Sequence, residues 1–226
     1  EDPFAGFIFN NKNTFPLATA REIAENTEST AYNPFLVCGR SGTGKSHLLQ
    51  AIAATLARST DAARMVCANA ARFCTEDTVW AKRPELFWQR YDVLILDDIQ
   101  DMSGHSTWQG NLVACMDACP GRQENGASPV HQQRGAFTCD TPARKEGRGR
   151  AAARMIFACS GHPQTLKTLD ERLRSRLESG LVVELMEPDL DVRLRYLQLM
   201  CKERRLSLTR EQLLFLAQRC SQFRLL

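Results

Sequence analysis

Gly39-Arg40-Ser41-Gly42-Thr43-Gly44-Lys45-Ser46 fits the phosphate-loop pattern G-x-x-x-x-G-K-[ST] at every required position. An apolar run at residues 35–38 precedes the loop, and a helical pattern at residues 47–58 follows it. This order of strand, loop and helix is the context in which the pattern binds nucleotide phosphates, and a chance glycine-rich turn rarely has it. The stretch therefore predicts a nucleotide site.

Each residue type in the loop has a chemical role. The glycines let backbone N–H groups turn inward around phosphates, and the start of the following helix adds free donors and positive potential. Lys45 would reach the β- and γ-phosphates, and Ser46 would offer its hydroxyl to Mg²⁺. We therefore expect the phosphates to contact Gly39, Ser41, Gly42, Thr43, Gly44, Lys45 and Ser46.

The rest of the chain alternates apolar runs with helical patterns. Short continuous apolar runs are typical of parallel strands buried on both faces, and four more occur at residues 65–68, 93–96, 155–159 and 181–185. Helical patterns occupy residues 16–26, 107–118, 191–203 and 209–220, the last beginning with the capping-box sequence Thr-Arg-Glu-Gln. We predict an α/β fold: a five-stranded parallel sheet flanked by helices over residues 1–187, then an incomplete helical subdomain over 188–226.

Residues 120–153 interrupt this alternation with a low-complexity segment of Gly, Pro, Arg, Gln and Ala, which predicts a loop insertion. Between 120 and 150 lie six of the 29 basic and three of the 26 acidic side chains, so this segment accounts for the whole net charge of +3. The rest of the chain is neutral and is not expected to bind polyanions by charge alone. The insertion lacks interleaved aromatics, which favours a solvated loop over a nucleic-acid contact.

The nine cysteines are odd in number and include no C-x-x-C pair, which predicts reduced thiols and a cytoplasmic protein. The spacing of Cys115, Cys119, His131 and Cys139 matches no common zinc pattern.

No apolar run approaches the length of a membrane span, and the N-terminus lacks the basic and apolar regions of a signal peptide. Since the sequence has no initiator Met, we expect it to be a fragment.

Two carboxylates, Asp97 and Asp98, follow the apolar run at 93–96. In a parallel sheet the carboxyl ends of the strands line the ligand crevice. We expect Asp97 to join the Mg²⁺ shell through water or through Ser46, and Asp98 to orient or deprotonate the attacking water. Together with the phosphate loop, this pair predicts a Mg-ATP site that hydrolyses its nucleotide.

A third motif, the arginine-rich stretch at residues 172–176, has two interpretations. One is a solvated basic helix. The other is a set of arginines that completes a phosphate site from a neighbouring surface, in cis or from another subunit. The residues alone leave both open.

Taken together, these residues resemble the AAA+ ATPase domain of the bacterial replication initiator DnaA, over nearly the whole chain except 120–153. The similar strings are residues 4–8 with Asn13, 31–34 before the phosphate loop, 47–49, 96–100, 169–181, and 187–190 with Arg193. The resemblance implies an AAA+ P-loop NTPase with a helical lid at 188–226, ATP or ADP with Mg²⁺ as ligands, and ATP-bound protomers that assemble at the replication origin.

The resemblance also implies roles for individual residues. Arg176 would be an arginine finger that acts on ATP bound by the adjacent protomer, and Arg172 would support that interface. Ser160 takes the place of the family's sensor 1 residue, and Arg224 that of the sensor 2 arginine, which contacts the γ-phosphate from the lid. The residues implied beside the rest of the nucleotide are Ile8, Asn13 and His47.

Several departures leave two functions open. The segment at 75–90 is shorter than the family's helices for single-stranded DNA, His105 and Thr107 replace basic residues for the same strand, and sensor 1 is Ser rather than Asp. The chain is expected to be either an initiator module or a DnaA-related (Hda-like) adaptor. The initiator module would bind ATP, self-associate, engage single-stranded DNA and hydrolyse slowly alone, whereas the nucleotide state of the adaptor would control its binding to another replication protein. A helicase-loader protein fits less well, because the box around Arg176 is so close to the initiator's.

Overall fold

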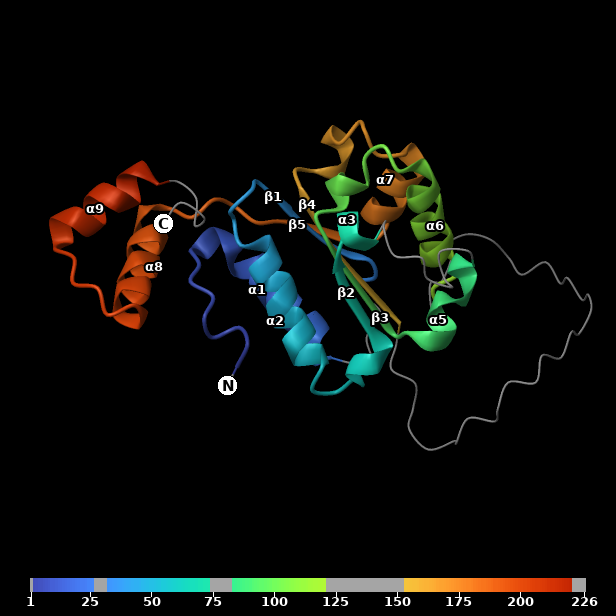
Figure 1. The fold of residues 1–226 in the computed structure, drawn as a ribbon, viewed down its shortest axis with the longest axis horizontal. Coiled ribbons are helices and arrows are strands. Elements are labelled where there is room, and N and C mark those ends of the chain that lie inside the picture. The colour runs from blue at the N-terminus through green and yellow to red at the C-terminus, as the bar shows by residue number, and fades with distance from the viewer. Residues whose placement is uncertain (1, 27–31, 74–82, 121–152, 221–226) are drawn as a thin grey trace, which may run out of the picture.

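The computed structural model describes residues 2–26, 32–73, 83–120 and 153–220. Its strands form one parallel sheet in the order β2-β3-β4-β1-β5 (Figure 1). They are β1 (Phe35–Gly39), β2 (Met65–Asn69), β3 (Val93–Asp97), β4 (Arg154–Ser160) and β5 (Leu181–Glu184). The predicted five-stranded parallel sheet is confirmed, and every apolar run coincides with a strand to within a residue.

Helices cover both faces of the sheet (Figure 1). One face packs against α1 (Thr14–Glu25) and α2 (Lys45–Leu56), and the other against α3 (Ala70–Phe73), α5 (Phe87–Arg90), α6 (Ser106–Asp117) and α7 (Glu171–Glu178). Short 3-10 turns lie between these elements: η1 (Asn11–Asn13), η2 (Ala62–Arg64), η3 (Pro84–Leu86), η4 (Ile99–Met102) and η5 (Pro163–Thr165). The result is a three-layer α/β/α domain.

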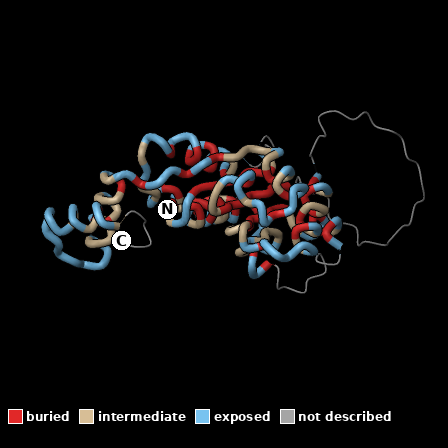
Figure 2. The backbone as a smooth tube through the Cα atoms, turned by 90° about the horizontal axis from the view of Figure 1, so that it is seen from above, coloured by how far each residue is buried: buried red, intermediate tan, exposed pale blue. Residues whose placement is uncertain are grey.

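The apolar runs are explained by the two cores that the sheet separates. Side chains alternate along a strand, so Phe35 and Val37 of β1 enter the core beside α1 and α2, whereas Leu36 and Cys38 enter the core beside α6 and α7. The central strands β1, β3 and β4 are buried almost throughout, whereas the edge strands β2 and β5 are partly exposed. Figure 2 shows the buried residues gathered in the interior of the main body, whereas the segment at the C-terminal end is mostly exposed.

Two helices, α8 (Leu190–Glu203) and α9 (Arg210–Arg219), extend from one end of the domain (Figure 1). The predicted capping box is present: Gln212 N donates to Thr209 Oγ1 at 3.3 Å and Thr209 N donates to Gln212 Oε1 at 2.9 Å. Helix α8 is capped by Asp189, which accepts a 2.9 Å hydrogen bond from Val192 N. The domain boundary at 187–188, which falls in the linker between β5 and α8, stays a prediction.

Some predictions fall outside the described residues: most of the insertion at 120–153, the segment 74–82, His131, Cys139 and Arg224.

The cysteines that the structure describes form no disulfide. Burial raises the pKa of Cys38 to about 11 and that of Cys159 to about 12, so both remain protonated thiols at neutral pH. No helix within the described ranges is both long enough and apolar enough for a membrane crossing.

The strand order determines which loops meet. Strands β3, β4 and β1 are consecutive neighbours, and the register pairs Gly39 with Ser160 and Asn69 with Asp97. All strands are parallel, so their carboxyl ends lie at one edge of the sheet. The phosphate loop, the two aspartates and Ser160 are therefore brought to that edge from three separate parts of the chain.

Candidate nucleotide site

A cavity of about 390 Å³ opens at the carboxyl ends of β1, β3 and β4. The phosphate loop and the start of α2 form one wall, and the turn after β3 with the end of β4 forms the other. Helix α2 begins at Lys45, so its first free N–H groups lie at this cavity. The lining residues are Ser41, Gly42, Gly44, Lys45, Ser46, His47, Asp98, Gln100, Asp101 and Ser160.

Two loop positions require glycine. Gly39 has φ +149°, and a Cβ there would lie 2.5 Å from the backbone oxygen of Leu185. Gly44 has φ +100°, and a Cβ there would lie 3.1 Å from Cζ of Phe7. L side chains rarely adopt such φ values, so the motif glycines allow the loop both its path and its close contacts.

The side chain of Lys45 lies inside the loop. Its Nζ donates to the backbone oxygens of Gly39 and Arg40, each at 2.9 Å, and the residue is only 5% exposed. Thr43 Oγ1 donates to the same Arg40 oxygen at 2.9 Å, which places Thr43 within the loop's own hydrogen bonds and not on the cavity wall. The loop carbonyls thus hold the ammonium next to the space predicted for the phosphates.

The opposite wall is built around Asp98, which has the left-handed backbone conformation φ 53°, ψ 52°. Its Oδ2 accepts from Nδ2 of Asn69 at 3.1 Å, and its Oδ1 accepts from Nε2 of Gln100 at 2.8 Å. Oε1 of Gln100 in turn accepts from Ser160 N at 2.8 Å. These contacts join the ends of β2, β3 and β4, and a non-glycine residue in this conformation is a common sign of a functional site.

Asp97 lies behind Asp98, because its Oδ1 accepts the backbone N–H of Asp98 at 2.9 Å and it is absent from the cavity lining. The side chains that line the cavity include hydroxyl and carboxylate oxygens, and oxygen atoms of these kinds are the ligands that Mg²⁺ prefers. Within the described residues no three His, Cys, Asp or Glu side chains could hold a metal by themselves. Mg²⁺ commonly uses few protein ligands beside phosphates and water, so the site fits this ion.

A second cavity, of about 360 Å³, shares Gly44 and His47 with the first. The rings of Phe7 and His47 stack there, with centroids 5.2 Å apart and an interplanar angle of 29°. The N-terminal segment and α8 supply the remaining walls: Gly6, Ile8, Tyr196, Leu199, Met200 and Glu203. A mostly apolar cavity that shares two lining residues with the phosphate cavity suits the base of a nucleotide.

Asn13 lines neither cavity, although it was expected beside the nucleotide. It is buried, with Nδ2 donating to Met186 O at 3.1 Å and Oδ1 accepting from Met186 N at 2.9 Å. Nearby, Nδ2 of Asn10 donates to Oδ2 of Asp189 at 3.1 Å. These bonds attach the N-terminal segment to the linker that leads into α8.

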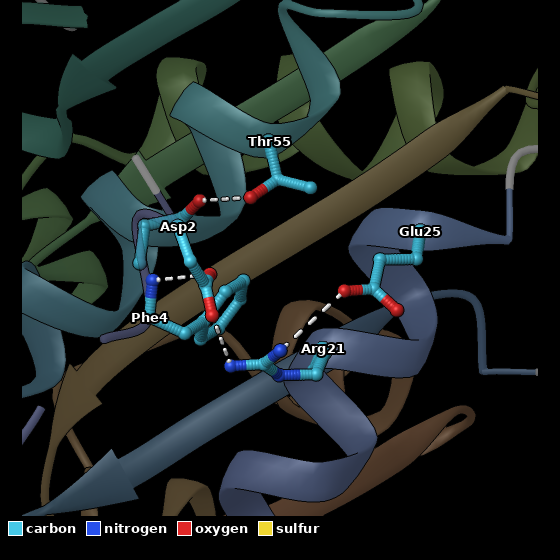
Figure 3. Close-up of polar contacts among 6 residues, drawn as sticks. Asp2, Phe4, Arg21, Glu25 and Thr55 are labelled. Carbon is cyan, nitrogen blue, oxygen red and sulfur yellow. Dashed lines mark hydrogen bonds and ion pairs between the residues drawn. The ribbon is translucent and has the colours of Figure 1, made fainter.

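The other end of the N-terminal segment is attached to α1 (Figure 3). Asp2 accepts hydrogen bonds from Phe4 N at 3.0 Å and from NH2 of Arg21 at 2.8 Å. The Arg21 guanidinium also lies 5.1 Å from the centre of the buried Phe4 ring. Phe7 and Ile8 lie a few residues after Phe4 in the same segment, so this attachment helps to position one wall of the second cavity.

We expect the attachment at Asp2 to be sensitive to pH. The N–H of Phe4 and the Arg21 guanidinium lower the pKa of Asp2. The stabilisation is therefore complete above the ordinary aspartate pKa of about 3.9 and is lost as the pH falls through the lower folded value. In Asp2→Asn, amide exchange at residues 4–8 should be faster at neutral pH, while exchange within α2 stays unchanged.

The control for this experiment is Glu25→Gln, which removes only the longer 3.7 Å pair between Arg21 and Glu25 (Figure 3). This control should leave exchange at residues 4–8 as it is. Equal exchange in Asp2→Asn and the unsubstituted chain would contradict the assignment.

The two predicted interface arginines lie at a separate cavity of about 350 Å³ between α6 and α7. Arg176 Nε pairs with Asp117 Oδ1 at 2.6 Å, and both side chains are nearly half exposed. Arg172 lines the same cavity. Neither arginine lines the phosphate cavity of its own chain.

In the described part of the shortened segment, residues 83–90, both aromatic residues are buried. Phe87 and Trp88 are buried, and Nε1 of Trp88 donates to Cys115 O at 2.7 Å. His105 and Thr107 are exposed at the start of α6. Residues 74–82 lie outside the described ranges.

Several contacts were not expected from the sequence: Asn69 and Gln100 around Asp98, Asp101 at the phosphate cavity, Asp117 beside Arg176, and the face of α8 at the second cavity. Asn69 could have been found, since it directly follows the strand predicted at residues 65–68 and the ends of parallel strands gather at one edge. The contribution of α8 depends on how the helix is oriented on the domain, for which its sequence pattern carries no signal.

Residues 2–124 match the family described as the bacterial DnaA ATPase domain. The chromosomal replication initiator protein DnaA of Pelobacter propionicus is 29% identical over 219 residues, which are 95% of this chain and 42% of that protein. The chain therefore spans less than half the length of this relative.

Solved structures show the same fold. DnaA from Aquifex aeolicus bound to AMPPCP is 25% identical with a TM-score of 0.71, the match covering 99% of this chain and 62% of that one. A replication initiator DnaA bound to AMPPCP and single-stranded DNA is 25% identical with a TM-score of 0.71, covering 96% and 60%. The RuvB Holliday junction branch migration motor of Thermotoga maritima, 15% identical with a TM-score of 0.60 over 96% and 59%, shares the fold alone.

Proposed function

The chain belongs to the bacterial DnaA ATPase domain family, and from this premise we propose that it is the ATP-binding and ATP-hydrolysing AAA+ module of a DnaA-type replication initiator. The observation that carries the proposal is the pair of cavities that meet at Gly44 and His47. A triphosphate in the first cavity directs its base into the second. This arrangement is what one extended nucleotide requires.

The phosphates would be held by the loop N–H groups, by the start of α2 and by Lys45, whose ammonium already lies in the loop. Ser46 would hold Mg²⁺ directly and Asp97 through water; when bound, this ion neutralises charge on the phosphates. The base would lie against Phe7, Ile8 and the α8 face. ATP and ADP can both occupy these contacts, and they differ in the γ-phosphate beside Asp98 and Ser160.

Hydrolysis by a single protomer would be slow, because Arg176 lines a surface cavity apart from the phosphates of its own chain. An arginine that enters from a neighbouring protomer stabilises the charge of the transferring phosphoryl group. ATP would therefore promote self-association as well as serve as substrate. Arg172 on the same surface would support the contact, and Arg224 in the lid keeps its proposed role as sensor 2. A protein of chromosome replication would act in the cytoplasm.

The adaptor function has one observation in its favour. Base stacking needs exposed aromatic rings, and Phe87 and Trp88, the aromatic residues in the described part of the shortened segment, are buried. In that case the chain would use its nucleotide state to control a DnaA-type partner and would not engage single-stranded DNA.

Two binding measurements test the proposal. Sedimentation should show self-association with a non-hydrolysable ATP analogue and Mg²⁺ but not with ADP. A labelled single-stranded oligonucleotide should bind more tightly in the ATP state, with an affinity that falls as salt rises. Self-association without DNA binding at low salt would favour the adaptor, and no binding of ATP would contradict both functions.

A further inference from the structure

Asp117 and Arg176 form an ion pair at the surface cavity between α6 and α7. Asp117 is the last residue of α6, and its Oδ1 accepts a hydrogen bond from Nε of Arg176 at 2.6 Å. Both side chains are nearly half exposed. The pair shares the cavity of about 350 Å³ with Val113, Glu171, Arg172 and Ser175. It therefore lies on the surface that carries the proposed arginine finger.

The position of Asp117 in its helix gives no reason for a carboxylate. The carboxyl end of a helix carries partial negative charge, which disfavours an acidic side chain there. An exposed ion pair adds little to folding stability. The consequence of Asp117 is therefore found in the arginine that it contacts and not in the stability of α6.

The contact at Nε leaves the end of the guanidinium available. An exposed arginine side chain moves among many rotamers, and fixing it costs entropy. Asp117 holds Arg176 by Nε, and within the described ranges the structure shows no other acceptor for this guanidinium. Nη1 and Nη2 thus remain able to pair with two phosphate oxygens side by side, as arginines commonly do.

We propose that Asp117 is a positioning residue for Arg176: it holds the side chain by Nε and leaves Nη1 and Nη2 for the γ-phosphate that a neighbouring protomer binds. This role rests on the proposed function, in which Arg176 acts on the ATP of another chain. A finger that is already held loses less freedom when it meets the charge of the transferring phosphoryl group. Asp117 touches no reacting atom, and its effect passes through Arg176.

The first test measures the ATPase rate per protomer at protein concentrations that allow association. Asp117→Ala should lower this rate about 2- to 10-fold, the range that corresponds to immobilising one long side chain. ATP affinity, self-association and melting temperature should stay unchanged. Asp117→Asn keeps an acceptor oxygen and should retain most of the rate. Asp191→Ala is the matched control, because Asp191 is an exposed aspartate that also pairs with an arginine and lines none of the three cavities.

The second test determines which protomer needs Asp117. In a mixture, Lys45→Ala supplies the finger but cannot hold ATP, and Arg176→Ala holds ATP but has no finger. Adding Asp117→Ala to the Lys45→Ala chain should lower hydrolysis by the mixture about 2- to 10-fold. Adding it to the Arg176→Ala chain should change nothing, because that chain has no finger to hold.

The outcomes separate this inference from the proposed function. Equal rates for Asp117→Ala and the unsubstituted chain would overturn the role of Asp117 and leave the proposed function intact. A higher rate would overturn it too, since the pair would then withhold the finger, and so would a loss that follows Asp117→Ala into either protomer. A mixture of Lys45→Ala with Arg176→Ala that regains no hydrolysis would contradict the proposed action between protomers, and with it this inference.

Discussion

Lys45→Ala should abolish measurable ATP binding. The ammonium forms charge-assisted hydrogen bonds, and losing two of them to the phosphates costs about 3–6 kcal/mol, which corresponds to a loss of affinity of about 10²- to 10⁴-fold. Calorimetry with Mg-ATP measures this directly. Thermal unfolding gives an independent measure, because a ligand that binds only the folded state raises the melting temperature, and this rise should disappear in the variant.

Two comparisons make the result specific. Lys167→Ala removes the same charge from an exposed position away from the cavity and should bind ATP normally. Lys45 also holds the carbonyls of Gly39 and Arg40, so the nucleotide-free variant should first be shown to unfold cooperatively. ATP affinity close to that of the unsubstituted chain would show that the phosphate-loop assignment is wrong.

Arg176→Ala should leave ATP affinity intact and remove the hydrolysis that depends on association. Arginine fingers contribute about 10³- to 10⁵-fold in other nucleotide hydrolases, so we expect turnover at high protein concentration to fall by about 10²-fold or more. Arg195→Ala, which removes an exposed arginine paired with Asp191 on α8, is the matched control. The measurement is the ATPase rate per protomer as a function of protein concentration.

A mixture of two variants distinguishes action in cis from action in trans. Lys45→Ala cannot hold ATP but keeps its finger, whereas Arg176→Ala holds ATP and lacks the finger. If the arginine acts on the neighbouring protomer, an equimolar mixture should regain hydrolysis that neither variant shows alone. A mixture as inactive as its components, with self-association intact, would show that Arg176 does not act in trans.

The fold was predictable because its main signals are local. A central parallel strand must be apolar on both faces, so residues 93–96 and 155–159 indicate buried strands without reference to anything distant. The phosphate loop requires a strand before it and a helix after it, and both are present. Capping chemistry is equally local, which is why the start of α9 at Arg210 could be read from the sequence.

Side-chain roles at the site were less predictable, because they depend on which distant residues arrive as partners. Asp98 lines the phosphate cavity, and its predicted role at the attacking water stays a prediction, but nothing in the sequence indicated that amides from β2 and from η4 engage both of its oxygens. The predicted place of Asn13 beside the nucleotide also stays a prediction, and the bonds of its amide to the backbone of Met186 had no local signal. The ion pair between Arg176 and Asp117 joins residues 59 positions apart and has no local signal.

The bonds from Asn13 to Met186 and from Asn10 to Asp189 have a kinetic consequence. The second cavity lies between the N-terminal segment and α8, and these bonds link the segment to the linker from which α8 departs. A base bound in this cavity would be enclosed by two elements that these bonds connect. If the base leaves only when the two elements separate, exchange of ADP for ATP would be slower than diffusion, and weakening these bonds by Asn13→Ala should speed it.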